Sequence, residues 1–119
     1  VLYTLLEGAS SLLEIERTDI SGCIDYRVLS NGEIETIFIL FDTVPGGAGH
    51  VRRIGKFERE DLKQLFQGSL EIVRQCKCGD WKGDTACYSC LCNYYNQKYH
   101  DILKRKYAIE FLSDIIGRF

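Results

Sequence analysis

The sequence from position 76 to position 92 reads CKCGDWKGDTACYSCLC and holds five of the six cysteines of this chain. Cys76 and Cys78 form one closely spaced pair, and Cys87 and Cys90 form a second pair after eight intervening residues. Each pair can present two thiolates to one cation, and Zn²⁺ favours four such ligands in a tetrahedron with Zn–S distances of about 2.3 Å. The spacing therefore predicts a zinc site with Cys76, Cys78, Cys87 and Cys90 as its ligands.

Four sulfur ligands leave no open coordination position for water or substrate, so we expect this zinc to be structural. Metal binding of this kind contributes about 10–16 kcal/mol to the folding of small domains. Loss of the metal is therefore expected to unfold at least the C-terminal third of the chain. A redox disulfide or a chance cluster is the competing interpretation. It is less favoured because nothing in the sequence indicates secretion, and thiols in a reducing compartment more often bind metal.

The two remaining cysteines have different expected fates. Cys92 lies two residues after Cys90 and could replace it as the fourth ligand, although we expect Cys92 to be a spare thiol. Cys23 is distant in sequence and falls on a predicted strand. The common fate of such a free cysteine is burial as a small hydrophobic residue, and we expect that here.

Length and composition are those of one globular domain, because the 119 residues are 45% hydrophobic and 27% charged. We therefore expect a single domain over residues 1–119. The chain lacks the GxxxxGK[ST] phosphate loop of a nucleotide-driven motor, so that class is excluded for this segment. No apolar run of about eighteen residues and no basic leader are present, so we expect no membrane span and a cytoplasmic location. Methionine is absent even at position 1, which predicts a domain of a larger protein.

The N-terminal part of the chain has the pattern of a helix followed by a β-hairpin. Apolar residues between positions 2 and 13 recur at the three-and-four spacing of an amphipathic helix, which we expect to end before Asp19. Alternation over residues 24–28, the turn Ser30-Asn31-Gly32 and an apolar run over residues 37–41 predict two strands and a tight turn. Because that run is continuously apolar, it predicts a strand covered on both faces at the centre of the fold.

Two further helices are predicted in the C-terminal part. Residues 62–73 keep helical spacing up to the cysteines, and apolar residues from Tyr99 to Ile116 line one face of a final helix. The sequence therefore predicts an α+β fold. In it, a small antiparallel sheet is packed by three principal helices, and the four-cysteine zinc knuckle lies between the C-terminal helices.

Two blocks of the sequence together resemble a known family. The first is FDTVPGGAGH at residues 41–50, and the second combines the two cysteine pairs with YYNQ at residues 94–97. They are similar to the zinc-binding domain at the C-terminus of the mitomycin-repair family of DEAD/DEAH-box DNA helicases. That domain also occurs in a subunit of a bacterial anti-phage defence system. The resemblance covers nearly the whole chain.

The resemblance implies a four-cysteine zinc module attached to the motor domains of an ATP-dependent DNA helicase. By motif position it places the ligands on Cys76, Cys78, Cys87 and Cys90. The implied function is that of an accessory domain in DNA repair or defence, which stabilises the motor or guides the DNA strand. The fragment itself is then not an enzyme, and its partners are the motor domains of the parent chain and DNA.

The distribution of charge along the chain gives a weak indication that a polyanion would bind the C-terminal part. Residues 1–42 hold eight acidic residues against two basic ones, whereas residues 43–119 hold thirteen basic residues against nine acidic ones. Seven basic residues after the glycine loop and near the C-terminus could contact phosphates: Arg52, Arg53, Lys56, Lys98, Lys104, Arg105 and Lys106. We take Arg52, Arg53, Lys104 and Arg105 as the candidates. Alternatively, these side chains pair with nearby carboxylates on exposed helical faces. The aromatic residues near the cysteines could stack on unpaired bases or simply pack around the metal: Trp81, Tyr88, Tyr94 and Tyr95.

An alternative function follows from Asp42 and His50, which flank a glycine-containing loop. An independent hydrolase or nuclease would use them as an acid and a base, with the loop amides holding an anion. The simpler interpretation is that Asp42 caps the loop amides and His50 is a surface or capping residue. A protein-docking module without a nucleic-acid role is a third possibility. We favour the accessory domain, which catalyses nothing by itself.

Overall fold

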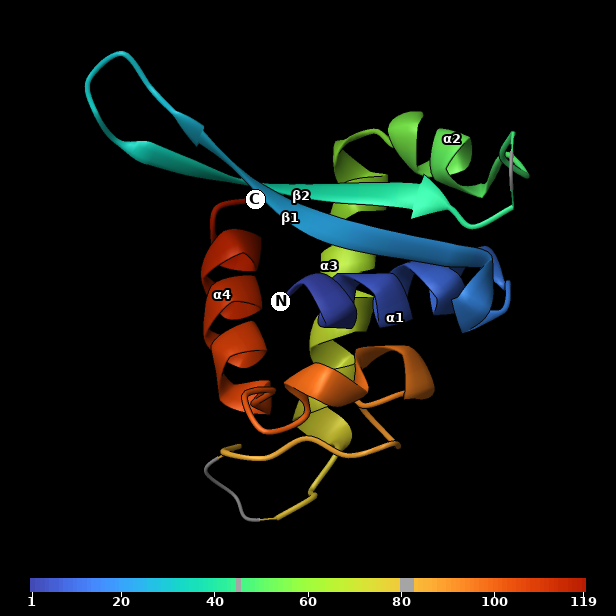
Figure 1. The fold of residues 1–119 in the computed structure, drawn as a ribbon, viewed down its shortest axis with the longest axis vertical. Coiled ribbons are helices and arrows are strands. Elements are labelled where there is room, and N and C mark those ends of the chain that lie inside the picture. The colour runs from blue at the N-terminus through green and yellow to red at the C-terminus, as the bar shows by residue number, and fades with distance from the viewer. Residues whose placement is uncertain (45, 80–82) are drawn as a thin grey trace.

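A computed structural model describes residues 1–44, 46–79 and 83–119 of the chain. Figure 1 shows α1 along the β1 side of a two-stranded antiparallel sheet and α2 along its β2 side, with α3 behind α1 and α4 beside it. The predicted α+β class is therefore confirmed. The elements are α1 (Leu2–Leu13), η1 (Arg17–Asp19), β1 (Ile20–Val28), β2 (Ile34–Asp42), α2 (His50–Gly55), α3 (Arg59–Gln75), η2 (Tyr94–Tyr99) and α4 (Arg105–Gly117), where η denotes a 3₁₀ segment.

The first helix ends as the sequence predicts. Its apolar stripe is buried, and Leu6 and Ala9 are completely inaccessible. Glu14 adopts the left-handed conformation, with φ 57°, and its N–H donates to the Ser11 carbonyl at 3.2 Å. This C-terminal cap stops α1 at Leu13, well before Asp19.

α1 and α3 cross with almost no space between their backbones. A Cβ atom built at Gly8 of α1 would lie 1.9 Å from Oγ of Ser69 in α3. Ser69 is itself completely buried and donates to the Leu65 carbonyl of its own helix at 2.7 Å. Gly8 is therefore the contact point that sets the separation of these two helices.

The sheet is a ribbon in which Ile20 pairs with Asp42 and Val28 pairs with Ile34. This register puts the even-numbered residues of both strands on one face. Ile20 is 1% exposed on that face, which lies against α1. The predicted pair of strands is therefore confirmed.

The prediction that residues 37–41 are covered on both faces is wrong. Only their even-numbered members, Phe38 and Leu40, pack against the hydrophobic clusters of the interior. Ile39 is 39% exposed on the outer face, and Cys23, its cross-strand partner, is exposed with it. The expected burial of Cys23 is therefore also wrong. The physical reason is that the sheet, within the described residues, has two strands and is a ribbon at the surface.

The far end of this ribbon projects beyond the helices (Figure 1). Its turn is closed by the Leu29 N–H, which donates to the Glu33 carbonyl at 2.8 Å, and Gly32 adopts φ 85° there. The predicted turn is thus confirmed. The inner face of the ribbon continues its apolar pattern into this uncovered end. We call the exposed side chains there the apolar hairpin face: Ile24, Tyr26, Val28 and Ile34.

α3 joins the two hydrophobic clusters of the interior. Its N-terminus is closed by a capping box between Glu58 and Asp61. Leu65 belongs to the cluster that includes Ile20 of the sheet, whereas Val73 belongs to the cluster that reaches the cysteines. The helix predicted over residues 62–73 is confirmed. No helix within the described parts of the chain is long and apolar enough to cross a membrane.

The final helix begins at Arg105 and not at Tyr99, as the spacing of apolar residues had predicted. The N–H groups of Arg105 and Lys106 donate to the Thr85 and Gly83 carbonyls at 3.2 and 2.9 Å, so the loop between the cysteine pairs caps the helix. Tyr99 lies instead in η2. Capping by a distant segment is invisible to a local apolar pattern, which explains the error.

The described residues between β2 and α2, which are 43–44 and 46–49, have the irregular structure expected from the sequence. The backbone φ angles of Gly46, Gly47 and Gly49 are 85°, 79° and 85°, and residues other than glycine rarely adopt such values. The loop leads into α2, a short helix that the sequence analysis did not predict. The Asp42 carboxylate accepts the Val51 N–H at 3.3 Å, so this side chain caps the start of α2.

Candidate metal centre

The Sγ atoms of Cys76, Cys78, Cys87 and Cys90 all lie within 4.8 Å of one another. Cys76 is 3.6 Å from Cys87, Cys78 is 3.9 Å from Cys90, and Cys87 is 4.0 Å from Cys90. With Zn–S distances of about 2.3 Å, the sulfur atoms of a tetrahedron are about 3.8 Å apart. The cluster therefore fits one Zn²⁺, and its separations exclude a disulfide between any of these pairs.

The first cysteine pair follows directly from the end of α3. Cys76 is the C-terminal cap of this helix and has extended backbone angles. Gly79 then turns the chain with φ 72°, and a Cβ atom there would lie 2.3 Å from Oγ1 of Thr85. That hydroxyl donates to the Cys78 carbonyl at 2.6 Å and lies 3.4 Å from the Cys78 sulfur. Thr85 therefore orients the first pair from outside the metal site.

The second pair occupies a tight turn. The Cys90 and Leu91 N–H groups donate to the Cys87 carbonyl at 3.0 and 3.1 Å. The Cys87 N–H lies 3.2 Å from the Cys90 sulfur and donates to it. Hydrogen bonds from amides to sulfur favour the thiolate, which is the form that binds zinc.

The ionisation of the two sulfurs of this turn differs. The Ser89 N–H lowers the pKa of the Cys87 thiol to about 7. Burial raises the pKa of the Cys90 thiol to about 12. A buried thiolate at Cys90 is unfavourable without a nearby cation, and Zn²⁺ supplies that charge. The donor set is thus suited to a metal ion and poorly suited to four free thiols.

Arg105 holds the cysteine segment from the side of α4. Arg105 is 4% exposed, and its guanidinium donates to the carbonyls of Val73, Cys76 and Cys78. A side chain with this burial and these partners does not face solvent where a phosphate could reach it. The structure therefore corrects its assignment as a phosphate contact: Arg105 is a structural clamp on the zinc knuckle, the segment from Cys76 to Cys90.

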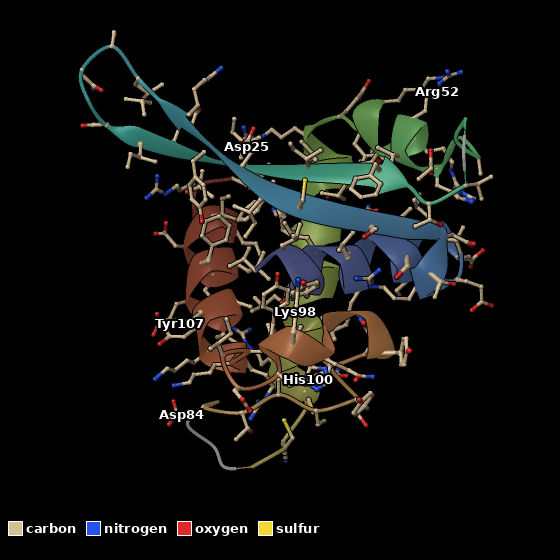
Figure 2. All side chains as sticks on the ribbon, in the orientation of Figure 1. Asp25, Arg52, Asp84, Lys98, His100 and Tyr107 are labelled. Carbon is tan, nitrogen blue, oxygen red and sulfur yellow. The ribbon has the colours of Figure 1, made fainter. Side chains whose placement is uncertain are left out.

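The other predicted phosphate contacts are not brought together. Arg52 and Arg53 are exposed on α2, and Nη1 of Arg53 donates to the Leu13 carbonyl at 3.5 Å. Lys104 is the N-terminal cap of α4. Lys106, two residues after Lys104, forms an ion pair with Asp84. Figure 2 places Asp84 at the opposite end of the molecule from Arg52. Among the described residues, no ion pair includes Arg52, Arg53 or Lys104.

The remaining candidates have structural contacts. Cys92 is buried but is not a member of the four-thiol group, and burial raises the pKa of its thiol. His50 is the first residue of α2 and is half-buried. The Tyr88 ring meets the His100 ring edge-on at 5.5 Å. The prediction for Trp81 lies outside the described residues, as does that for the Tyr95 side chain.

Sequence reasoning missed a polar network that fixes the turn after the second pair. Asn96 is completely buried, and its Nδ2 donates to the Leu91 carbonyl at 2.8 Å. Its Oδ1 accepts the Asn93 N–H at 2.9 Å and lies 2.8 Å from Nε2 of His100. The spacing of Asn93, Asn96 and His100 by three and four residues could have predicted this turn, since asparagine side chains close local turns of this kind.

Comparison with known proteins agrees with this geometry. Residues 1–91, which include all four clustered cysteines, match the family described as the MrfA Zn-binding domain, MZB. Druantia protein DruE of Escherichia coli (strain UMEA 4076-1) is 27% identical over 118 residues, a match covering 93% of this chain and 6% of that protein. No solved structure matches the chain. The family match and the four-thiol cluster together indicate a structural zinc, and the chain belongs to the MrfA Zn-binding domain family.

Proposed function

We propose that this chain is an accessory domain of a longer, ATP-dependent DNA helicase that acts in DNA repair or defence. The observation that carries the proposal is the closed cluster of four thiols between α3 and α4. Four sulfur ligands hold a metal without activating water, so the centre shapes a surface and performs no turnover. Residues 1–119 act as one such domain, in the reducing cytoplasm.

The length of the relative supports a role inside a larger machine. The chain spans 6% of the length of the DruE protein, and it lacks the phosphate loop that ATP hydrolysis requires. In our proposal the motor domains lie elsewhere in the longer protein. The domain described here stabilises them and guides the DNA strand.

The tip of the apolar hairpin face, formed by Val28 and Ile34, supports packing against those motor domains. These two side chains are 72% and 68% exposed, although they lie on the same face of the ribbon as the buried Ile20. An isolated two-stranded ribbon is marginally stable in water. Uncovered apolar side chains on such a ribbon favour a contact with another domain.

Asp42 and His50 support the rival hydrolase less well. The Asp42 carboxylate accepts the Val51 N–H, which is the capping role of the simpler interpretation. Asp42 also lines neither part of the groove described below, and no hydrogen bond of the described residues joins it to His50. We therefore propose no reaction at this pair.

Two measurements test the proposal. The zinc-loaded chain is assayed for hydrolysis of single-stranded DNA and of an activated ester. We expect no turnover, and a turnover that Asp42→Ala and His50→Ala abolish would overturn the accessory role.

The second measurement uses the longer protein that contains this chain. Val28→Ser with Ile34→Ser should slow ATP-dependent strand separation, because the domain would no longer dock on the motor. The matched control is Asp25→Ser, an exposed polar residue on the same strand. Strand separation that is unchanged by the hairpin variant and by Cys90→Ser would contradict the proposal.

A further inference from the structure

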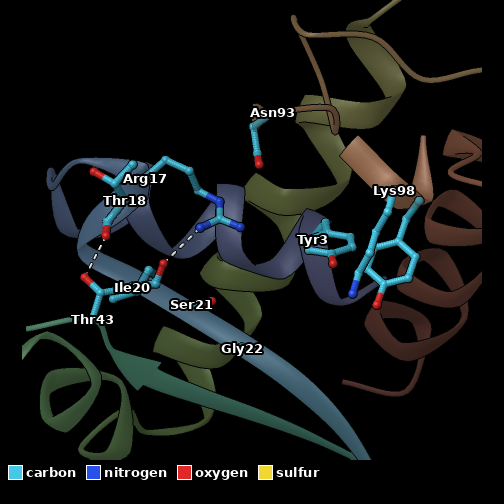
Figure 3. Close-up of a pocket in the computed structure, with 10 residues that line it drawn as sticks. Tyr3, Arg17, Thr18, Ile20, Ser21, Gly22, Thr43, Asn93 and Lys98 are labelled. Atoms are coloured by element: carbon cyan, nitrogen blue, oxygen red, sulfur yellow. Dashed lines mark hydrogen bonds between the residues drawn. The ribbon is translucent and has the colours of Figure 1, made fainter. Parts of the chain in front are cut away.

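A groove runs along β1, between that strand and η2. Its first part is a cavity of about 410 Å³, shown in Figure 3, and its second part is an adjoining hollow of about 560 Å³. The two parts share Tyr3, Gly22 and Tyr99, so they form one continuous depression. Its lining includes none of the four clustered cysteines and none of Arg52, Arg53, Lys104 and Arg105.

At one end of the groove lies the Arg17 guanidinium, whose position is fixed by two contacts. Nη1 of Arg17 donates to the Ile20 carbonyl at 2.9 Å, and its Nε lies 3.3 Å from Oε1 of Glu7. Figure 3 shows the guanidinium reaching from η1 toward Tyr3 along the cavity. These contacts fix the guanidinium before any ligand arrives, which lowers the entropic cost of binding.

Lys98 supplies the second cation from the opposite wall. Its ammonium lies 5.0 Å from the centre of the Tyr99 ring. No carboxylate of the described residues lies within ion-pair distance of it. Because Glu7 offsets the charge of Arg17, the cavity has about one uncompensated positive charge. That charge matches a single phosphodiester better than a polyphosphate.

Aromatic rings line the middle of the groove. The Tyr3 and Tyr99 rings are 6.3 Å apart and tilted by 36° to each other, and Tyr99 is 37% exposed. The second hollow continues past them to Tyr26, which is also exposed. Aromatic side chains beside a cationic groove are the pattern by which proteins bind single-stranded nucleic acid, because every base can stack on them.

We propose that this groove binds single-stranded DNA, with one phosphodiester between Arg17 and Lys98 and its base against Tyr99 and Tyr3. The next base occupies the second hollow, beside Tyr26. The inference rests on the proposed function, because it names the surface through which the domain guides the strand. It moves the DNA contact away from Arg52 and Arg53 on α2.

The test measures binding of a fluorescein-labelled thymidine oligonucleotide to the zinc-loaded chain by fluorescence anisotropy. Tyr99→Ala should raise the Kd about 5- to 150-fold, since one base loses its stacking partner. Tyr99→Phe keeps the ring and should restore binding. Lys98→Ala should weaken binding and lower the slope of log K against log salt by about 0.7, the value for one phosphate contact on a single strand.

Arg52→Ala with Arg53→Ala is the matched control, because it removes two exposed cations outside the groove. If that variant weakens binding while Lys98→Ala and Tyr99→Ala do not, the groove assignment is overturned and a strand-guiding role still stands. If the zinc-loaded chain binds no oligonucleotide at low salt, the inference fails. The strand-separation test of the longer protein then decides the proposed function separately.

A second readout covers variants that fold poorly. An oligonucleotide carrying 5-iodouracil is crosslinked to the unmodified chain by light, and the attached peptides are identified by mass spectrometry. Crosslinks at Tyr3 or Tyr99 are expected. Crosslinks confined to α2 would overturn the proposal.

Discussion

Arg105 and Cys78 are joined by a hydrogen bond of 2.8 Å between the guanidinium Nη2 and the main-chain carbonyl. The same guanidinium donates through Nη1 to the carbonyls of Val73 and Cys76. One buried cation thus satisfies three carbonyls where α3 ends, and it ties the start of α4 to the zinc knuckle. Bonds from a charged donor are stronger than neutral ones, which gives this side chain a large share of the local stability.

Replacing this side chain should destabilise the fold. Arg105→Met keeps the apolar stem but leaves three carbonyls without their donor, and we expect a loss of about 3 kcal/mol in the free energy of unfolding. Urea unfolding of the zinc-loaded chain measures it. Arg52→Met, at an exposed position, is the control and should change stability by no more than about 0.5 kcal/mol. Equal stability of the two variants would contradict the clamp.

The identity of the fourth ligand can be measured directly. Cys90→Ser should lower the bound zinc well below one ion per chain, because the Cys90 sulfur lies within the four-thiol group. Cys92→Ser should retain the full zinc content, since Cys92 lies outside that group. Elemental analysis of both purified, reduced variants decides the matter. The reverse result would assign the ligand to Cys92.

Proton release should change with pH in a way that reflects Cys87. Its thiol has a pKa of about 7, whereas burial raises the pKa of Cys90 to about 12. Zinc binds thiolates, so every protonated thiol loses its proton on binding. Cys90 releases a proton throughout the range from about pH 6 to pH 8, but Cys87 does so only below its pKa. Zinc affinity should therefore rise with pH across this range.

The number of protons released per zinc should fall by about one between about pH 6 and pH 8. Calorimetric titrations in two buffers of different ionisation enthalpy measure it. Cys92→Ser should show the same decrease, since that thiol is not a ligand. A constant release over this range would contradict the low pKa of Cys87.

Replacing two helical glycines, Gly8 and Gly68, by alanine should change the stability of the fold in opposite directions. Gly8→Ala places a methyl group 1.9 Å from Oγ of Ser69 and should cost about 1–3 kcal/mol, because the α1–α3 crossing is overpacked. Gly68→Ala, on α3, meets no atom within 4 Å and should stabilise the chain by about 0.5–1 kcal/mol. Thermal unfolding of both variants tests the prediction. A stable Gly8→Ala variant would mean that the helices can separate at no cost.

The parts of the fold that depend on local pattern were predictable. The three-and-four spacing identified α1 and α3, and the turn residues before Gly32 identified the hairpin. The paired cysteines identified the thiol cluster, because their spacing alone brings two sulfurs to one cation. In these cases the determining interactions lie within a few residues of one another.

The parts that depend on distant contacts were not predictable. The start of α4 is set by the Gly83 and Thr85 carbonyls, about twenty residues earlier in the chain. The exposure of Ile39 depends on the number of strands in the sheet, which no local run of apolar residues reveals. Arginine is usually exposed at the surface, so the sequence gives no sign that Arg105 is buried. Its burial depends on three carbonyls that only the folded chain brings together.

α3 is a single uninterrupted helix of 17 residues, so it extends about 25 Å. Leu65, in the first half of the helix, belongs to the hydrophobic cluster under the ribbon. Cys76, just after its last residue, belongs to the thiol cluster. A rod of this length holds both clusters on one rigid element, so the distance between the sheet and the metal site is set by a single helix and not by the packing of separate segments.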